Sequence, residues 1–142
     1  MMISTRGRYA LRVMIDLAEN AGDGLVPMKY VAERQNISLK YLEQILPNLV
    51  KADMIRGTHG KKGGYCLTRS PEQYSAGEII RIAEGEVVTV SCQECGAQPC
   101  KNEKICRTRP MWDELNSMIN QYLDRVTVAD LMKDKSLVGE EK

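Results

Sequence analysis

Apolar residues recur at helical spacing in three segments of the first fifty positions. In residues 4–20 they are three and four positions apart, with Ser4 as the expected N-cap, and the stretch AGDG (21–24) ends the run. Pro27 suits the first position of a short second helix that reaches about residue 34. Ser38 is placed to cap a third helix, whose predicted buried face comprises Leu39, Leu42, Ile45, Leu46 and Leu49.

The corner between the second and third helices, QNIS (35–38), is short, and the outward face of the third helix is polar. That face carries Lys40, Tyr41, Glu43, Gln44 and Asn48. The arrangement is typical of a helix-turn-helix, although any small helical bundle could show it. Pro47 removes one backbone hydrogen bond inside the third helix at a cost of about 3 kcal/mol, so a kink or an early end is expected there.

The segment MIRGTHGKKGGYCLT (54–68) predicts two short strands, about 54–57 and 65–68, around a glycine-rich turn. The turn carries His59, Lys61 and Lys62, so the hairpin is thin and cationic at its tip. Such a hairpin suits a phosphate backbone or a minor groove, whereas a merely solvated tip is the alternative. Because the hairpin directly follows a helix-turn-helix pattern, we interpret it as the wing of a DNA-binding winged helix.

Two further helices are predicted on either side of a cysteine-rich stretch. Ser75 and Glu78 form a capping box for a fourth helix that ends near Gly85. From Trp112 to Val126 the apolar residues again recur at three- and four-residue steps, in a helix more apolar than one small domain needs. Such a helix commonly pairs with its copy in a homodimer, and packing onto its own domain is the alternative.

The predicted fold class is mostly α, with a small β-wing. We expect a winged helix-turn-helix domain (1–85), a cysteine-rich loop (86–107), a dimerisation helix followed by a short helix (108–132), and a flexible tail (133–142).

Charge and composition exclude several classes of protein. The net charge of +1 conceals eleven Lys and Arg against six Asp and Glu in residues 1–70, and random scatter or a polyanionic partner would each explain this excess. The chain has no run of eighteen apolar residues and no convincing signal peptide, so we expect no membrane partner and a cytoplasmic location. Its single histidine, His59, belongs to no recognisable catalytic set, so an enzyme is not expected.

Four of the five cysteines fall within the stretch SCQECGAQPCKNEKIC (91–106). A reducing compartment disfavours disulfides and points to metal or redox chemistry. Four thiolates suit tetrahedral zinc and either a 2Fe–2S or a 4Fe–4S cluster equally well. The fifth, Cys66, lies on a wing strand and is expected to be a small core residue.

Several motifs of the chain are those of one known family. They are STRGRYALRVMIDLA (4–18), ISLKYLEQIL (37–46), GKKGGYCL (60–67), SAGEIIRIAEG (75–85) and CRTRPMWDELN with YLDRVTVADLM (106–132). With these motifs the sequence resembles the bacterial winged-helix transcriptional regulators of the IscR/NsrR/CymR family. The resemblance implies a homodimeric repressor that binds palindromic promoter DNA, with the third helix in a major groove and the wing in the adjacent minor groove.

Carried over by position, the resemblance implies DNA contacts at the start of the first helix, on the recognition helix and on the wing. They are Arg6, Arg8, Tyr9, Lys29, Ser38, Lys40, Tyr41, Glu43, Gln44, Arg56, His59, Lys61 and Lys62. Gln44 could pair with adenine through two hydrogen bonds. Glu43 could accept from a cytosine amine, or be a surface carboxylate without a base partner.

For the cysteine loop, the resemblance implies that Cys92, Cys100 and Cys106 ligate an iron–sulfur cluster that senses redox state, nitric oxide or iron–sulfur status. Cys95 could supply the fourth ligand, because the two positions used elsewhere in the family hold arginines, Arg8 and Arg109, which cannot ligate. Two rival hypotheses remain. One is the same regulator with zinc or free thiols, controlled by a protein partner or a small ligand. The other is a small iron–sulfur electron carrier.

Overall fold

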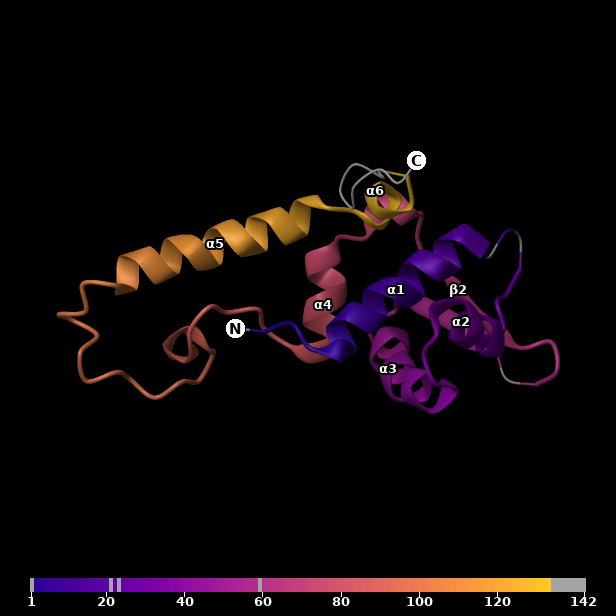
Figure 1. Cartoon of the computed structure of the whole chain (residues 1–142), viewed down its shortest axis with the longest axis horizontal. Helices are drawn as coiled ribbons and strands as arrows, with labels where there is room; N and C mark the ends of the chain where they lie inside the picture. Colours follow the sequence, from indigo (N-terminus) through magenta and orange to yellow (C-terminus); the bar gives the residue numbers. More distant parts are fainter. Residues whose placement is uncertain (1, 21, 23, 59, 134–142) are drawn as a thin grey trace.

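The computed structural model of the chain describes residues 2–20, 22, 24–58 and 60–133. The elements follow one another as α1 (Thr5–Asn20), α2 (Met28–Gln35), α3 (Leu39–Lys51), β1 (Ile55–Thr58), β2 (Gly64–Leu67), η1 (Pro71–Gln73), α4 (Ala76–Glu84), η2 (Ser91–Gln93), α5 (Arg109–Arg125) and α6 (Val128–Lys133). Figure 1 shows a head built from α1–α4, α6 and the hairpin, with α5 and the loop before it extending to one side. The order of three helices and a hairpin is that of a winged helix-turn-helix, as expected.

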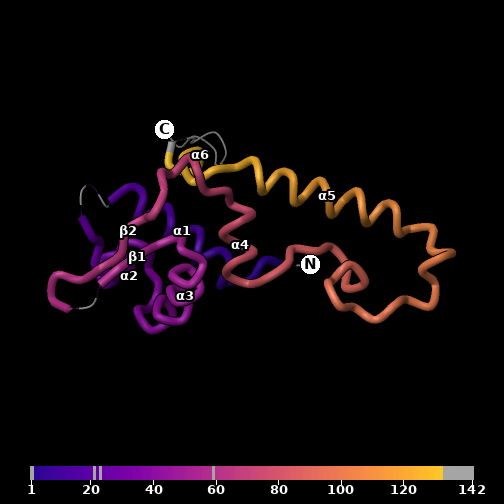
Figure 2. The backbone as a smooth tube through the Cα atoms, turned by 180° about the vertical axis from the view of Figure 1, so that it is seen from behind, coloured from indigo at the N-terminus to yellow at the C-terminus, as the bar shows by residue number. Residues whose placement is uncertain are grey.

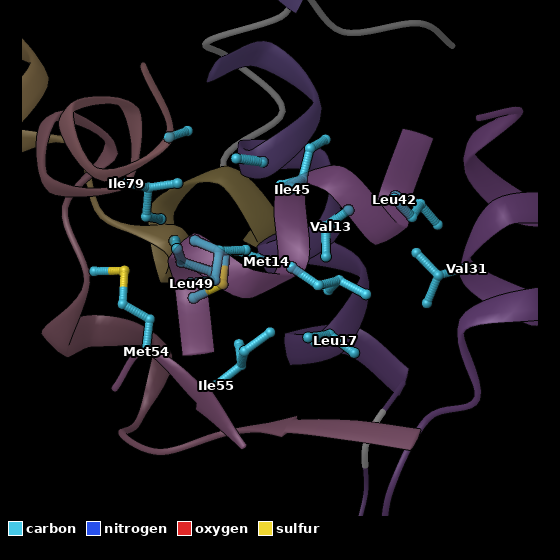
Figure 3. Close-up of a cluster of buried hydrophobic side chains, with 14 of the residues drawn as sticks. Val13, Met14, Leu17, Val31, Leu42, Ile45, Leu49, Met54, Ile55 and Ile79 are labelled. Atoms are coloured by element: carbon cyan, nitrogen blue, oxygen red, sulfur yellow. The ribbon is translucent and has the colours of Figure 1, made fainter. Parts of the chain in front are cut away.

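The core forms where α1 crosses the other helices of the head. Val13, Met14 and Leu17 project from one face of α1 and are fully buried. They pack in one apolar cluster with Leu42 and Leu49 of α3, as Figure 3 shows. Burying a side chain of this size stabilises the fold by about 1.5–3 kcal/mol. The helical spacing in the sequence therefore predicted this buried face of α1 correctly.

Helix α3 departs from the sequence prediction at two positions. Leu39 was assigned to the buried face, but its side chain is 43% exposed. As the first residue of the helix, it lies before the turn that contacts α1. Of the kink or early end expected at Pro47, the early end does not occur, since α3 runs on to Lys51. The buried Leu46 and Leu49 flank the proline and hold its turn against the core, which offsets the lost backbone bond.

The corner of the helix-turn-helix is fixed by the backbone. Asn36 adopts a left-handed conformation with φ of 54°, and its N–H donates to the carbonyls at the end of α2. The Ser38 side chain then accepts from the N–H of Tyr41 at 3.1 Å, which caps α3 as predicted.

The hairpin is held to the head at its base. β1 and β2 pair antiparallel, with Ile55 opposite Leu67 and Thr58 opposite Gly64, so each predicted strand was within one residue of its observed bounds. Val26 pairs with Tyr65 through two backbone hydrogen bonds of 2.9 and 3.0 Å. This close approach requires a glycine at position 64, because a Cβ there would overlap the Val26 carbonyl.

A single buried hydroxyl fastens the end of β2. Tyr74 donates to the carbonyl of Met54 at 2.8 Å and accepts from the N–H groups of Thr68 and Arg69, both at 2.9 Å. The Arg69 guanidinium lies over the Tyr74 ring at 4.3 Å and forms an ion pair with Glu78.

The predicted capping box at the start of α4 is half formed. Ser75 accepts from the Glu78 N–H at 3.0 Å, but the Glu78 side chain accepts from Arg69 and not from the backbone of the cap residue.

Helix α5 begins away from the head and contacts it near its C-terminal end (Figure 1). Arg81 of α4 donates to Asn120 at 3.1 Å and forms an ion pair with Asp124. The chain then turns at Val126 into the short helix α6, which packs against α1 (Figure 2). None of the described helices is both long and apolar enough to cross a membrane. The predicted tail at 133–142 lies, apart from Lys133 at the end of α6, outside the described residues.

Candidate DNA-binding surface and cysteine loop

The recognition helix α3 presents a polar ridge to solvent. Lys40, Glu43 and Gln44 are exposed in its first two turns, as the sequence predicted, and Ser38 precedes them. A cavity of ≈ 260 Å³ separates this ridge from the wing, and its lining includes Leu39, Glu43, Thr58 and Gly63. The Glu43 side chain therefore faces the crevice between helix and wing.

Two tyrosines join the start of α1 to α3. The rings of Tyr9 and Tyr41 meet edge to face, with centroids 5.3 Å apart, and both side chains are half-buried. Arg12 lies over the Tyr9 ring at 5.2 Å and donates to the Gln35 side chain and carbonyl. The position of the recognition helix is thus tied to α1 through aromatic packing.

A buried carboxylate fixes α2 on α1. Asp16 is 1% exposed and accepts from Arg34 at 2.7 and 3.0 Å and from Gln35 at 2.9 Å. Burial on its own would raise the pKa of Asp16, but the hydrogen bonds from Arg34 and Gln35 and the charge of Arg34 together hold it below its ordinary value. The same contact raises the pKa of Arg34. A charged Asp16 therefore stabilises the first helix of the helix-turn-helix.

The predicted cationic contacts that the structure describes lie on α1, α2 and the hairpin. Arg6 and Arg8 are exposed at the start of α1, Arg56 on β1, and Lys61 and Lys62 at the tip of the wing. Lys29 is exposed at the start of α2 and lies over the Tyr30 ring at 4.9 Å. The predicted contact at His59 lies outside the described residues. Figures 1 and 2 show α3 and the wing in neighbouring parts of the head. Arg56 lines the cavity at the end of α1, together with Cys66, and is absent from the lining of the crevice between α3 and the wing.

The four clustered cysteines lie between Ser91 and Thr108, in the part of the cysteine loop that leads to α5. Cys92, Cys95 and Cys100 are exposed, Cys106 is half-buried, and all are free thiols. Cys66, expected in the core, is only half-buried, because its strand forms one wall of a cavity that reaches the end of α1.

Gln93 fastens the start of the loop to the start of α5. Its side-chain oxygen accepts from the Thr89 hydroxyl at 2.6 Å, and its amide donates to Asp113 at 3.0 Å. Asp113 also accepts from Arg109 at 2.9 Å. The Gln93 hydrogen bond and the Arg109 charge lower the pKa of Asp113, and the same ion pair raises the pKa of Arg109. Cys92 and Cys106 consequently lie at two ends of a loop that is closed by side chains.

Thiols are the donors that zinc and iron–sulfur clusters prefer, so the chemistry of the loop fits such a centre. Cys106 is well suited to act as a thiolate ligand, because its contact with the Thr108 hydroxyl at 3.4 Å lowers the pKa of its thiol. Among the described residues, no three His, Cys, Asp or Glu side chains already form a metal cage. The loop would therefore have to close around a metal centre as it binds.

Helix α5 exposes an apolar face to solvent. Met111, Leu115, Met118 and Tyr122 are 51%, 39%, 60% and 46% exposed and recur at three- and four-residue steps. They lie away from the side on which Asn120 contacts α4. A face of this kind on a helix that leaves its own head is typical of an interface.

Comparison with known proteins identifies the family. The sequence model of the Rrf2 family, described as "Iron-dependent Transcriptional regulator", matches residues 3–134. The chain belongs to the Rrf2 family. The regulator IscR of Sodalis glossinidius is 34% identical over 138 residues, covering 97% of this chain and 82% of the relative.

Solved structures support the same assignment. The global cysteine regulator CymR of B. subtilis superimposes with a TM-score of 0.75 at 34% identity, over 93% of this chain and 96% of that one. IscR of T. potens also gives a TM-score of 0.75, at 32% identity, over 100% of this chain and 93% of the other. This Rrf2 protein is therefore a winged helix-turn-helix, DNA-binding transcriptional regulator and not an enzyme.

The sequence did not reveal the side chains whose hydrogen bonds connect distant segments of this regulator. Asp16, Tyr74, Glu84 and Gln93 each bond segments far apart in the chain, and no local motif marks three of them. Only Glu84 could have been singled out from the sequence. A carboxylate at the C-terminal end of a helix is unfavourable next to the helix dipole, so it indicates a stabilising partner elsewhere in the fold.

Proposed function

We propose that this Rrf2 protein is a homodimeric, cytoplasmic repressor of transcription whose grip on palindromic promoter DNA is set by a labile iron–sulfur cluster in the cysteine loop. The single observation that carries the proposal is the loop itself. It holds four free thiols and links the DNA-binding head directly to α5.

The DNA contacts proposed by resemblance agree with the exposed cations and polar groups around α3. Gln44 would pair with adenine in the major groove, and Lys61 and Lys62 would bind phosphates or the minor groove. His59, at the wing tip, is proposed from the sequence alone. The half-buried Tyr9 and Tyr41 would act chiefly by orienting the recognition helix.

The apolar face of α5 supports a homodimer. Two copies of this face would cover Met111, Leu115, Met118 and Tyr122 and would set the spacing of the two heads. The proposed units follow the sequence: a DNA-binding domain (1–85), a cysteine loop (86–107), the dimerisation and short helices (108–132), and the tail (133–142).

Cys92, Cys100 and Cys106 would hold the cluster, with Cys95 as the fourth ligand. When bound, the cluster would supply a redox- and nitric-oxide-sensitive link between the ends of the loop. Gln93 and the Arg109–Asp113 pair keep those ends together, and Arg81 sets the angle between α4 and α5. Loss of the link would loosen the loop and change operator affinity by about 1–3 kcal/mol, the usual size of a coupling free energy.

Purification without air tests the proposal. We expect a coloured protein with stoichiometric iron and sulfide that prefers a subset of duplexes from a random pool, with affinity that falls as salt rises. A colourless, iron-free protein that still selects duplexes would contradict the cluster. Membership of a family of transcriptional regulators argues against the electron carrier, and a cluster protein indifferent to every duplex would contradict control of DNA binding by the cluster.

A second candidate is the same DNA-binding regulator with zinc or free thiols, controlled by a protein partner or a small ligand. The likeness to CymR, whose structure covers nearly the whole chain, favours it, as does the exposure of the thiols. Zinc in place of iron and sulfide in the air-free protein would select this candidate.

A further inference from the structure

The last residue of α4 reaches across to the first turn of α1. The backbone N–H of Ser4 donates to both carboxylate oxygens of Glu84, at 2.9 and 3.2 Å. Ser4 directly precedes α1, where the N–H groups have no partner within the helix and the helix dipole favours a negative charge. Glu84 therefore caps α1 from a different helix, through the backbone N–H of Ser4.

Gly7 makes room for this contact. It is buried in the first turns of α1, and a Cβ at this position would overlap the Glu84 carboxylate and lie 3.0 Å from its Cδ. Glycine inside a helix costs about 1 kcal/mol relative to alanine, so its presence here needs a compensating contact. The approach of Glu84 supplies that contact.

The segment after Glu84 continues into the cysteine loop. Gly85 ends α4 with φ of 99°, a conformation that favours glycine. One residue later, the Glu86 carboxylate accepts from the backbone N–H of Cys95 at 2.9 Å. The two carboxylates on either side of Gly85 thus hold the start of α1 and the middle of the loop, respectively.

These three segments enclose a common space. A cavity of ≈ 180 Å³ is lined by Met2, Ile3, Glu84, Glu86, Val87, Val88 and Glu94. Figures 1 and 2 both show the N-terminal residues beside the end of α4 and beside the segment that leads into the cysteine loop. A movement of the loop at Cys95 therefore has a short path, through residues 84–86, to the first turn of α1.

We infer that Glu84 is a positioning residue for DNA binding, which orients the first turn of α1, with Arg6 and Arg8, and transmits the state of the cysteine loop to it. This inference rests on the proposed role of the two arginines and of the loop. Arg6 and Arg8 flank Gly7 on the turn that Glu84 caps, so release of the cap frees both cations. A disordered first turn then binds DNA phosphates less well, because it must be ordered again on binding.

Hydrogen exchange in the metal-free protein tests the contact without DNA. Gly7→Ala displaces the Glu84 carboxylate while favouring helix, and Glu84→Gln removes only its charge. We expect exchange of the Ser4 amide, which donates to Glu84, and of the Arg8 amide, which donates to the Ser4 carbonyl, to accelerate at least fivefold in both variants. Gly24→Ala and Glu72→Gln are matched controls, because position 24 has open space around it and Glu72 is exposed on η1. Unchanged exchange in a folded Gly7→Ala protein would overturn the inference.

A double-mutant cycle tests transmission. Glu86→Ala releases Cys95 from the 84–86 segment, and affinities are measured for a duplex selected from a random pool by the wild-type protein. We expect about tenfold weaker binding for Gly7→Ala with a shallower salt dependence, and an effect of Glu86→Ala that disappears in the Gly7→Ala background. Additive effects would overturn transmission. A wild-type protein that selects no duplex would contradict the proposed function, whereas the exchange result would still decide whether Glu84 holds α1.

Discussion

The rings of Tyr9 and Tyr41 meet edge to face, with an interplanar angle of 76° and centroids 5.3 Å apart. This contact joins the turn of α1 that follows Arg6 and Arg8 to the first turn of the recognition helix. The two surfaces proposed to contact DNA are therefore held in one fixed relation by packing between two residues that the sequence suggested only as DNA contacts.

We predict that Tyr9→Ala weakens operator binding by about fivefold, because an edge-to-face pair is worth about 0.5–1.5 kcal/mol and its loss frees α3 from α1. Tyr9→Phe keeps the ring and serves as the control, with binding close to that of the wild type. Fluorescence anisotropy on a selected duplex measures both. Equal losses in the two variants would show that the hydroxyl binds DNA directly.

Substitutions at Gln44 and Lys62 are predicted to impair DNA binding in different ways. Gln44→Ala should cost about 1–3 kcal/mol and relax the base preference at one operator position, since it removes a bidentate base contact. Lys62→Ala should weaken binding to all duplexes alike and reduce the salt slope by about 1. Selection from a random pool at two salt concentrations separates the outcomes. Unaltered base preferences in Gln44→Ala would remove Gln44 from base readout.

Cys100→Ala is predicted to abolish stoichiometric iron binding in protein purified without air. Its operator affinity should also lose any dependence on iron or oxygen, because the loop can no longer close around a cluster. Cys66→Ala is the matched control, since that thiol lies on β2, outside the loop. If Cys100→Ala responds to oxygen as the wild type does, Cys100 holds no sensing centre.

Met118→Lys on the apolar face of α5 should convert the dimer to a monomer. Met118 is 60% exposed in the single chain, so the change does not disturb the head, but a charge would be buried in the proposed dimer. Sedimentation equilibrium measures the mass. Ser117→Lys, exposed on another face of the same helix, should remain dimeric. A dimeric Met118→Lys protein would place the interface elsewhere.

The stability contributed by Asp16 is predicted to depend on pH. Its pKa is lower in the folded chain than the ordinary value of about 3.9, so the unfolded chain takes up the proton first as the pH falls. The stabilisation is therefore fully present above about pH 5 and is lost as the pH falls below about 4. Asp16→Asn should lower the free energy of unfolding by about 1–3 kcal/mol at pH 7 and by little at pH 3. Urea unfolding across this range measures the difference, and a gap independent of pH would contradict the ion pair.

Much of the head could be read from local pattern. Helical spacing identified the buried face of α1, Ser38 and Ser75 marked two helix starts, and the glycines of the hairpin marked the wing. These features depend on neighbours within four residues, or on backbone conformations that few residues adopt. Leu39 was misplaced by the same reasoning, because apolar spacing does not say where a helix first meets its neighbour.

The sequence by itself determined the order of elements, the cationic wing and the concentration of thiols in one loop. Only the tertiary structure decided which distant groups meet: Glu84 on the start of α1, Gln93 on Asp113, and Asp16 beneath Arg34. These contacts join residues between eighteen and eighty positions apart, and they depend on how the helices pack as rigid bodies. No local preference encodes such a meeting, since a carboxylate or an amide finds its partner only after the apolar core has brought the elements together.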